Sequence, residues 1–172
     1  MIVVLLAALA LQSSASPLDT ASPPQAESSS VAADPDAAAA AATLDRMHQA
    51  ASRADGAAYF EQFAPDARFI GTDAAEHWSL DQFRAYADPI FARGTGWTYR
   101  PRERTLTVSG DIAWFDEVLD NDSYGVLRGS GVLKRFGPDQ AWKIEQYVLS
   151  FAVPNDRADA VVRIIREPDP AR

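Results

Sequence analysis

The chain has 172 residues, a formal net charge of −8 at pH 7 and no cysteine. The lack of cysteine excludes disulfides, thiol nucleophiles and zinc–thiolate sites. The acidic balance argues against nucleic acids and anionic membranes as partners, because both attract proteins with a basic face.

An apolar run begins the chain. Residues 1–11 are apolar without interruption, but a transmembrane helix needs about 20 such residues. Small polar residues follow and suit cleavage after Ala15, so residues 1–15 are predicted to be a signal peptide. We expect a periplasmic or secreted protein with no integral membrane anchor after cleavage. Because no Lys or Arg precedes the run, the alternatives are an upstream start or an apolar N-terminus of a cytosolic protein.

The next segment, residues 16–36, is rich in Ser, Pro, Ala and Asp and shows no apolar periodicity. Such a segment cannot bury enough apolar surface to offset the entropy of ordering it. It is therefore predicted to be a disordered linker. We expect a single folded domain over residues 37–166, a usual size for one core, and a disordered tail over residues 167–172.

Helical patterns dominate the first half of this domain. The spacing of apolar residues predicts a first helix over residues 37–53 and a short second helix over residues 57–63. A strand is predicted over residues 67–72. Ser79, with a glutamine three residues later, forms a capping box that begins a third helix. Pro89 is expected to kink or split that helix.

From residue 97 onward the pattern changes to period two, which is typical of strands. Short turns between consecutive strands imply an antiparallel meander. Helices segregated from such a sheet make an α+β domain, whose long twisted sheet curls around the helices into a cone with a mouth. A ligand would bind between sheet and helices. The predicted strands are residues 97–108, 112–119, 125–136 and 141–153, and a last helix, capped by Asn155, is predicted over residues 155–166.

Charged residues inside two predicted strands are the first candidates for a site. Asp116 and Glu117 lie in the middle of one strand and Arg128 in the middle of the next, and burying an unpaired charge is costly. Strand neighbours point to opposite faces, so we predict that Asp116, which shares a face with Trp114, faces the pocket. Arg128 could hold an anionic or carbonyl group. The alternative is a structural ion pair of the acids with Arg128 or Arg100.

A loop after the first strand offers two more carboxylates, Asp73 and Glu76. Carboxylates beside aromatic side chains can have raised pKa values and act as general bases, whereas the alternative for Asp73 is capping a turn. The two histidines lack metal-ligand spacing, so no metal or cofactor is expected. The catalytic candidates are Asp73 and Asp116, and the ligand-binding candidates are Glu76, Trp78, Trp97, Trp114, Glu117, Arg128 and Gln146.

Short motifs between residues 43 and 162 carry a family resemblance. They are Phe69-Ile-Gly-Thr-Asp73, Glu76-His-Trp78, Gly96-Trp97, Ala113-Trp-Phe-Asp-Glu117, Arg128-Gly-Ser-Gly-Val-Leu133, Trp142-Lys-Ile144 and Pro154-Asn155. With the predicted order of elements, they resemble the SnoaL-like branch of the nuclear transport factor 2 (NTF2)-like superfamily. The resemblance implies three N-terminal helices packed on a strongly curved, mostly antiparallel sheet, with a short C-terminal helix. It implies no single function, because the superfamily contains isomerases, cyclases, dehydratases, hydrolases and binding modules.

We therefore expect an exported domain that binds a small, partly apolar organic molecule in the cone-shaped pocket. One alternative is a cofactor-independent acid–base enzyme, an isomerase, cyclase or dehydratase, with Asp73 or Asp116 as base and Arg128 stabilising negative charge. In the superfamily, isomerases pair such a base with tyrosine donors, for which Tyr59, Tyr86, Tyr99 and Tyr147 are available here. The other alternative is an interaction module, because family members often form homodimers through the sheet.

Overall fold

The computed structural model describes residues 34–167 of the chain. The expected signal peptide, most of the expected linker and residues 168–172 lie outside the described residues. Helix α1 (Pro35–Ser52) begins inside the segment that was expected to be linker. Two features fix this start: Asp34 accepts a hydrogen bond from the backbone N–H of Asp36, and a proline occupies the first helical position, where no N–H is needed.

Two shorter helices follow, α2 (Gly56–Glu61) and α3 (Leu80–Ala92). The predicted capping box is present, because the side chains of Ser79 and Gln82 each accept a hydrogen bond from the other residue's backbone N–H. Pro89 lies inside α3 without ending it, so the expected split does not occur. Its exposed position explains this, since water can reach the carbonyl that loses its partner.

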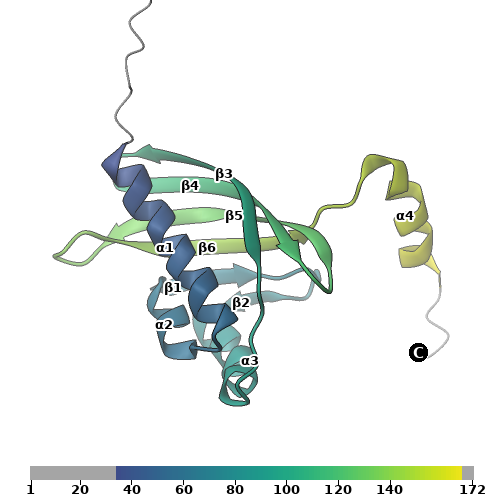
Figure 1. Cartoon of the computed structure of the whole chain (residues 1–172), viewed down its shortest axis with the longest axis horizontal. Helices are drawn as coiled ribbons and strands as arrows, with labels where there is room; N and C mark the ends of the chain where they lie inside the picture. Colours follow the sequence, from purple (N-terminus) through teal and green to yellow (C-terminus); the bar gives the residue numbers. More distant parts are fainter. Residues whose placement is uncertain (1–33, 168–172) are drawn as a thin grey trace, which may run out of the picture. The chain divides into compact units, whose positions relative to one another are not determined.

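A single sheet of six strands, in the order β2-β1-β6-β5-β4-β3, carries the domain (Figure 1). Strands β3 to β6 form the antiparallel meander that the short turns predict. β1 instead runs parallel to β6, and β2 pairs antiparallel with β1, so the sheet is mixed. The sequence does not predict β2, because three residues are too few to show a period. The strands are β1 (Phe63–Ile70), β2 (His77–Ser79), β3 (Arg100–Ser109), β4 (Ile112–Asn121), β5 (Gly125–Phe136) and β6 (Ala141–Phe151).

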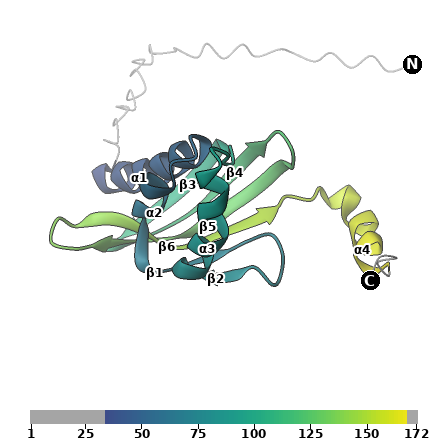
Figure 2. The same cartoon turned by 90° about the horizontal axis from the view of Figure 1, so that it is seen from below.

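Helices α1 to α3 lie on one face of the sheet, and the core lies between the two layers (Figure 2). Successive side chains along β4 point alternately to the helix-covered face and to the opposite face. Phe115, Glu117 and Leu119 are buried beneath the helices, whereas Trp114 and Asp116 are exposed on the opposite face. The domain therefore has the two-layer α+β architecture that the sequence predicts.

The sheet bends where β5 meets β6. The register between these strands shifts at Val132 and Leu133. Gly131 precedes the shift, and a Cβ atom there would lie only 2.0 Å from the carbonyl oxygen of Gln146. A larger residue would push the two backbones apart, so this glycine is needed for the bend.

The C-terminal segment consists of a 3₁₀ turn, η1 (Asn155–Arg157), and helix α4 (Ala158–Arg166). The predicted last helix is therefore present, but Asn155 lies in the 3₁₀ turn and does not cap α4. α4 leaves Ile164 and Ile165 with 69% and 75% of their surface exposed. Within residues 34–167, no helix combines the length and the apolar character that crossing a membrane requires.

Candidate functional site

A cavity of about 250 Å³ opens between α3, the turn after β1, and the ends of β5 and β6. Aliphatic residues contribute only Leu127 and Leu149 to its lining, and Gly71, Thr72 and Glu76 come from the turn. The remaining lining residues are aromatic: Phe69, Trp78, Phe83, Tyr86, Trp97, Tyr99, Tyr124 and Phe151. A concave site lined mainly by aromatic side chains with a few polar groups is typical of a small-molecule site.

Near-parallel rings form one wall of this cavity. The rings of Phe69 and Phe83 stack with centroids 3.9 Å apart at 14°, and Phe83 faces Trp78 at 5.7 Å and 10°. Trp78 in turn stacks on Tyr86 at 4.9 Å and 26°. Phe83 and Tyr86 share one face of α3 because they are three residues apart. The wall thus runs from the buried Phe83 to Tyr86, which is 52% exposed at the mouth.

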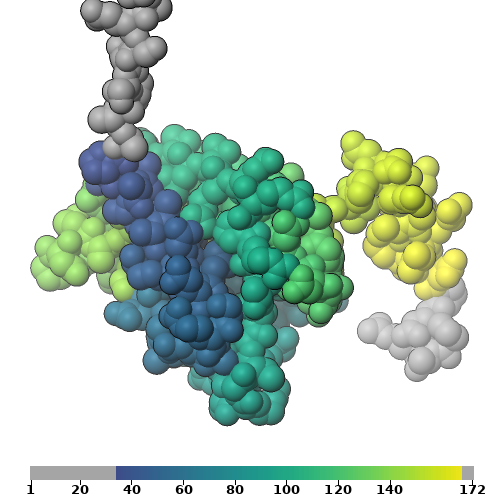
Figure 3. Space-filling view, in the orientation of Figure 1, coloured from purple at the N-terminus to yellow at the C-terminus, as the bar shows by residue number. Residues whose placement is uncertain are grey.

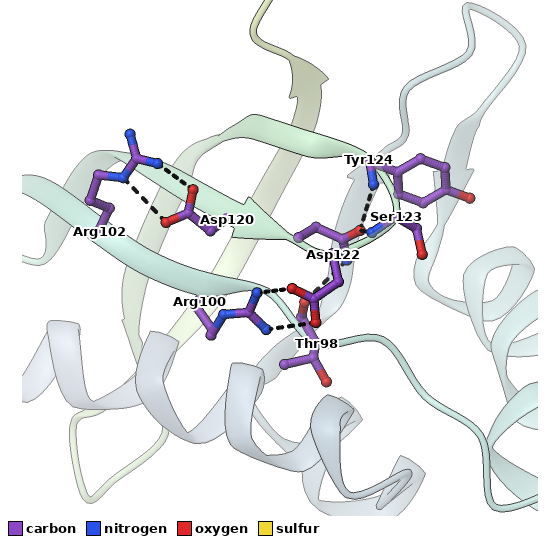
Figure 4. Close-up of polar contacts among 8 residues, drawn as sticks. Thr98, Arg100, Arg102, Asp120, Asp122, Ser123 and Tyr124 are labelled. Carbon is purple, nitrogen blue, oxygen red and sulfur yellow. Dashed lines mark hydrogen bonds and ion pairs between the residues drawn. The ribbon is translucent and has the colours of Figure 1, made fainter.

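The turn between β4 and β5 carries Tyr124, another exposed residue of the lining. The Asn121 side chain accepts hydrogen bonds from the backbone N–H groups of Ser123 and Tyr124, both at 2.9 Å. The same side chain donates to the Thr98 carbonyl at 3.1 Å, which ties the turn to the segment before β3 (Figure 4). Two ion pairs join β3 to this region: Arg102 pairs with Asp120 at the end of β4, and Arg100 pairs with Asp122 in the turn. Asn121 therefore positions Tyr124 over the cavity.

Glu76 is the lining residue with a carboxyl side chain. Its Oε2 atom accepts a hydrogen bond from the Asp73 backbone N–H at 3.2 Å. The carboxylate lies across Gly71, where a Cβ atom would be 2.1 Å from Oε2. Asp73 itself is exposed and accepts a hydrogen bond from the Ala75 N–H at 2.8 Å, so it caps the turn as the alternative interpretation states.

The tyrosines at the mouth face the same space as Glu76. Burial raises the pKa of Tyr99 to about 12, with further increases from the nearby Tyr124, Tyr86 and Glu76. The Tyr99 phenol is therefore a neutral hydrogen-bond donor at physiological pH. The cavity thus offers aromatic faces, phenol groups and one carboxylate.

A second cluster of polar side chains, centred on Glu117, lies inside the core. The carboxylate accepts hydrogen bonds from the Tyr147 hydroxyl at 2.8 Å and from Arg104 Nε at 2.8 Å, and its Oε1 lies 2.7 Å from His48 Nε2. Arg104 also contacts Asp45 at 2.8 Å. Burial raises the pKa of Glu117, but the hydrogen bonds and charges of His48 and Arg104 outweigh it and hold the pKa below its ordinary value.

Tyr147 is the third residue that contacts the Glu117 carboxylate in this buried network. Burial, followed by the charge and hydrogen bond of Glu117, raises the Tyr147 pKa well above its usual range. Gly129 makes room for the contact, because a Cβ atom there would lie 2.2 Å from the Tyr147 hydroxyl. Glu117 is therefore an ionised acceptor and Tyr147 a neutral donor inside a buried structural network.

A shallow groove of about 270 Å³ lies above this network, between α1 and the segment that enters β3. In Figure 3 these two segments lie side by side on the visible face. His48, Gln49 and Ser52 line it from the helix, and Tyr99 lines it from the other side, so Tyr99 separates the groove from the aromatic cavity. Across residues 34–167, no three His, Asp or Glu side chains converge as a metal site would require.

The structure brings together three of the predicted ligand-binding residues, Glu76, Trp78 and Trp97, around the aromatic cavity. Their role in binding stays a prediction. The expectation that Asp116 faces the pocket is wrong, because the buried phase of β4 contains Phe115 and Glu117 instead.

The other predicted site residues lie elsewhere. Trp114 is 48% exposed on the outer face of the sheet. Arg128 is exposed opposite Val118 in β4. Gln146 is half-buried and lies opposite Val132. Glu117 does pair with an arginine, as the structural alternative holds, but Arg104 supplies it rather than Arg128 or Arg100.

Sequence reasoning missed three contributors to these sites. His48 lies four residues after Leu44 on the apolar face of α1, a spacing that indicates a buried histidine. Arg104 lies directly opposite Glu117 in the β3–β4 register, but that register becomes clear only once the strand ends are known. Tyr124 lies in a turn, where no periodic pattern signals a binding residue.

The fold and the aromatic cavity define an NTF2-like α+β domain. The sequence profile of the SnoaL-like domain matches residues 40–154, and the chain belongs to this family within the NTF2-like superfamily. Among proteins with curated descriptions, no significant match is found.

Solved structures with low sequence identity share the fold. A domain of unknown function with a cystatin-like fold from Nostoc punctiforme is 17% identical, with 81% of this chain and 91% of that chain covered and a TM-score of 0.62. An NTF2-like protein of unknown function from Pseudomonas putida is 16% identical, with 71% and 90% covered and a TM-score of 0.60. A ketosteroid isomerase-like protein from Erwinia carotovora atroseptica is 18% identical, with 69% and 98% covered and a TM-score of 0.53.

Proposed function

We propose that this domain binds a small, partly apolar organic molecule in the aromatic cavity. The wall of near-parallel rings from Phe69 to Tyr86 is the observation that carries the proposal. The stacked rings give the cavity an apolar aromatic wall, and Tyr86, Tyr99 and Tyr124 add hydroxyl groups at the mouth. Such a surface favours ligands that combine an apolar body with one polar end.

The size of the cavity limits the ligand further. Its volume of about 250 Å³ lies below the range of roughly 300–1,000 Å³ that is usual for drug-sized ligands. The mouth residues Tyr86 and Tyr124 are 52% and 61% exposed, so a ligand can enter without unfolding of the core. We therefore propose a ligand of about the size of a single substituted ring.

Binding can be tested with p-cresol as the probe, by isothermal titration calorimetry on the full chain. The double variant Tyr86→Ala/Tyr124→Ala removes two exposed contact surfaces, and we expect the affinity for p-cresol to fall about tenfold. Trp114→Ala is the matched control, because Trp114 is similarly exposed but lies on the opposite face of the sheet. Equal affinity in all three proteins would place the binding site elsewhere and refute the proposal.

A cofactor-independent acid–base enzyme is the second candidate, and Glu76 favours it. A carboxylate beside aromatic rings and the neutral phenol of Tyr99 could exchange a proton with a bound carbonyl compound. Asp73 is engaged in its turn and Asp116 faces outward, so neither supports this candidate as well. An enzyme of this kind would lose turnover in Glu76→Gln while still binding its substrate.

A homodimer through the sheet is proposed as a separate property of the domain. Trp114 exposes 48% of its surface on the outer face of β4, next to the half-buried Val132 of β5. Exposed aromatic residues of this kind are enriched at protein interfaces.

Export of the domain is also part of the proposal, and the apolar residues 1–11 support it. The mature protein should begin at Ser16, which intact-mass measurement of the protein from its own host would test. A protein that retains residues 1–15 would contradict export by a cleaved signal.

A further inference from the structure

We propose that the ligand of the aromatic cavity is a small organic cation, such as a quaternary ammonium compound. This inference rests on the proposed binding function and specifies its ligand class. Three observations carry it: the charge of the lining residues, the arrangement of the rings, and the fixed place of one carboxylate. All three observations concern residues within the described part of the chain.

The first observation is the charge of the lining. Lys, Arg and His contribute no side chain to the cavity lining, whereas Glu76 contributes a carboxylate. Arg100, whose neighbour Tyr99 lines the cavity, pairs with Asp122 instead. An anionic ligand would therefore meet a like charge without a compensating partner, which disfavours binding.

The second observation is the number of aromatic rings that line the cavity together with that carboxylate. Trp78 and Tyr86 stack on each other, and Trp97, Tyr99 and Tyr124 also line the cavity. A cation is attracted to the negative face of an aromatic ring, most strongly to tryptophan, and cages of such rings recognise quaternary ammonium groups. Tyrosine hydroxyls alone would suit many ligands, but aromatic rings combined with a carboxylate favour a positive charge.

The third observation is that the protein holds Glu76 in place. The Asp73 N–H engages Oε2, and the backbone at Gly71 leaves just enough room for the carboxylate. Gly71 does not adopt a left-handed backbone conformation, so the turn itself does not require glycine there. A Cβ atom would nevertheless collide with Glu76, at 2.1 Å from Oε2 and 2.9 Å from its Cβ. The glycine thus sets the position of the charge.

Choline and 3,3-dimethylbutan-1-ol make a matched pair of probes, because they differ only by carbon in place of the charged nitrogen. We expect the full chain to bind choline about tenfold more tightly than the neutral alcohol in calorimetry. Glu76→Gln should reduce this preference, because it removes the carboxylate and keeps the aromatic rings of the lining. Glu103→Gln, which removes an exposed carboxylate of β3, should keep the preference and controls for net charge.

Gly71→Ala provides an independent test, since it keeps the charge of Glu76 but displaces the carboxylate. We expect it to lower the affinity for choline several-fold more than the affinity for 3,3-dimethylbutan-1-ol. If choline binds no better than the alcohol while p-cresol binds, the cation inference fails and the proposed binding function stands. If none of the three probes binds, the proposed binding function fails as well.

Discussion

The Glu117 network gives the sharpest prediction about stability. Glu117 is 1% exposed, and its carboxylate contacts Arg104, His48 and Tyr147, each within 2.8 Å. Glu117→Gln keeps the shape of the side chain but removes the charge, so Arg104 loses the buried partner that its guanidinium requires. Removing one partner of a buried ion pair typically costs about 3–5 kcal/mol.

The expected loss lies at the lower end of that range. Arg104 retains its contact with Asp45, and 13% of its side chain is exposed, so part of its charge stays compensated. We expect Glu117→Gln to lower the free energy of unfolding by about 3 kcal/mol, which corresponds to a fall in Tm of roughly 10 °C for a domain of this size. Urea unfolding followed by circular dichroism at pH 7 would measure it.

Asp116→Asn is the control, because it makes the same chemical change one residue away on the exposed face. A surface substitution of this kind should change stability by less than about 0.5 kcal/mol. If Glu117→Gln costs no more than Asp116→Asn, the contacts of Glu117 contribute nothing net, and the assignment of a structural network is wrong.

Three further predictions concern pH, packing and assembly. Because the pKa of Glu117 lies below its ordinary value of 4.5 in the folded state, its contribution to stability is complete above that value and is lost as the pH falls through the lower folded pKa. Acid unfolding should therefore be shallower in Glu117→Gln than in wild type, and parallel curves would refute the linkage. Gly129→Ala should destabilise the domain by about 1–3 kcal/mol through overpacking, since its Cβ would lie 2.2 Å from the Tyr147 hydroxyl; unchanged urea unfolding would contradict this. If the outer face of the sheet forms a dimer, Trp114→Arg should yield a monomer in light scattering, and a monomeric wild type would refute the interface.

The fold was largely predictable because its signals are periodic. The apolar residues of α1, the capping box of α3 and the alternation in β3 to β6 each extend over many residues. The elements that were missed have short or conflicting signals. β2 has only three residues, and the start of α1 at Pro35 depends on a cap inside a segment whose composition indicates a linker.

The phase of β4 shows why the candidate site was harder to predict. Alternation requires that only one of Asp116 and Glu117 is buried, but each shares its face with an aromatic residue, Trp114 or Phe115. Which of the two carboxylates is buried depends on which face of the sheet the helices cover and on whether a basic side chain can pair with the buried charge. That partner, Arg104, lies on another strand, so the answer comes from the register and not from β4 itself.

The buried carboxylate of Glu117 and the cavity-lining carboxylate of Glu76 have different roles. Tyr147 lies between them, because its hydroxyl binds Glu117 while its ring stacks on Phe69 at 5.8 Å and 6°. Glu117 has its acceptor capacity taken up by protein donors, so it has little to offer a ligand. Glu76 has one oxygen bonded to the backbone and lies at an open cavity. The inner carboxylate therefore holds the aromatic wall in place through Tyr147, and the outer one is the group that a ligand would meet.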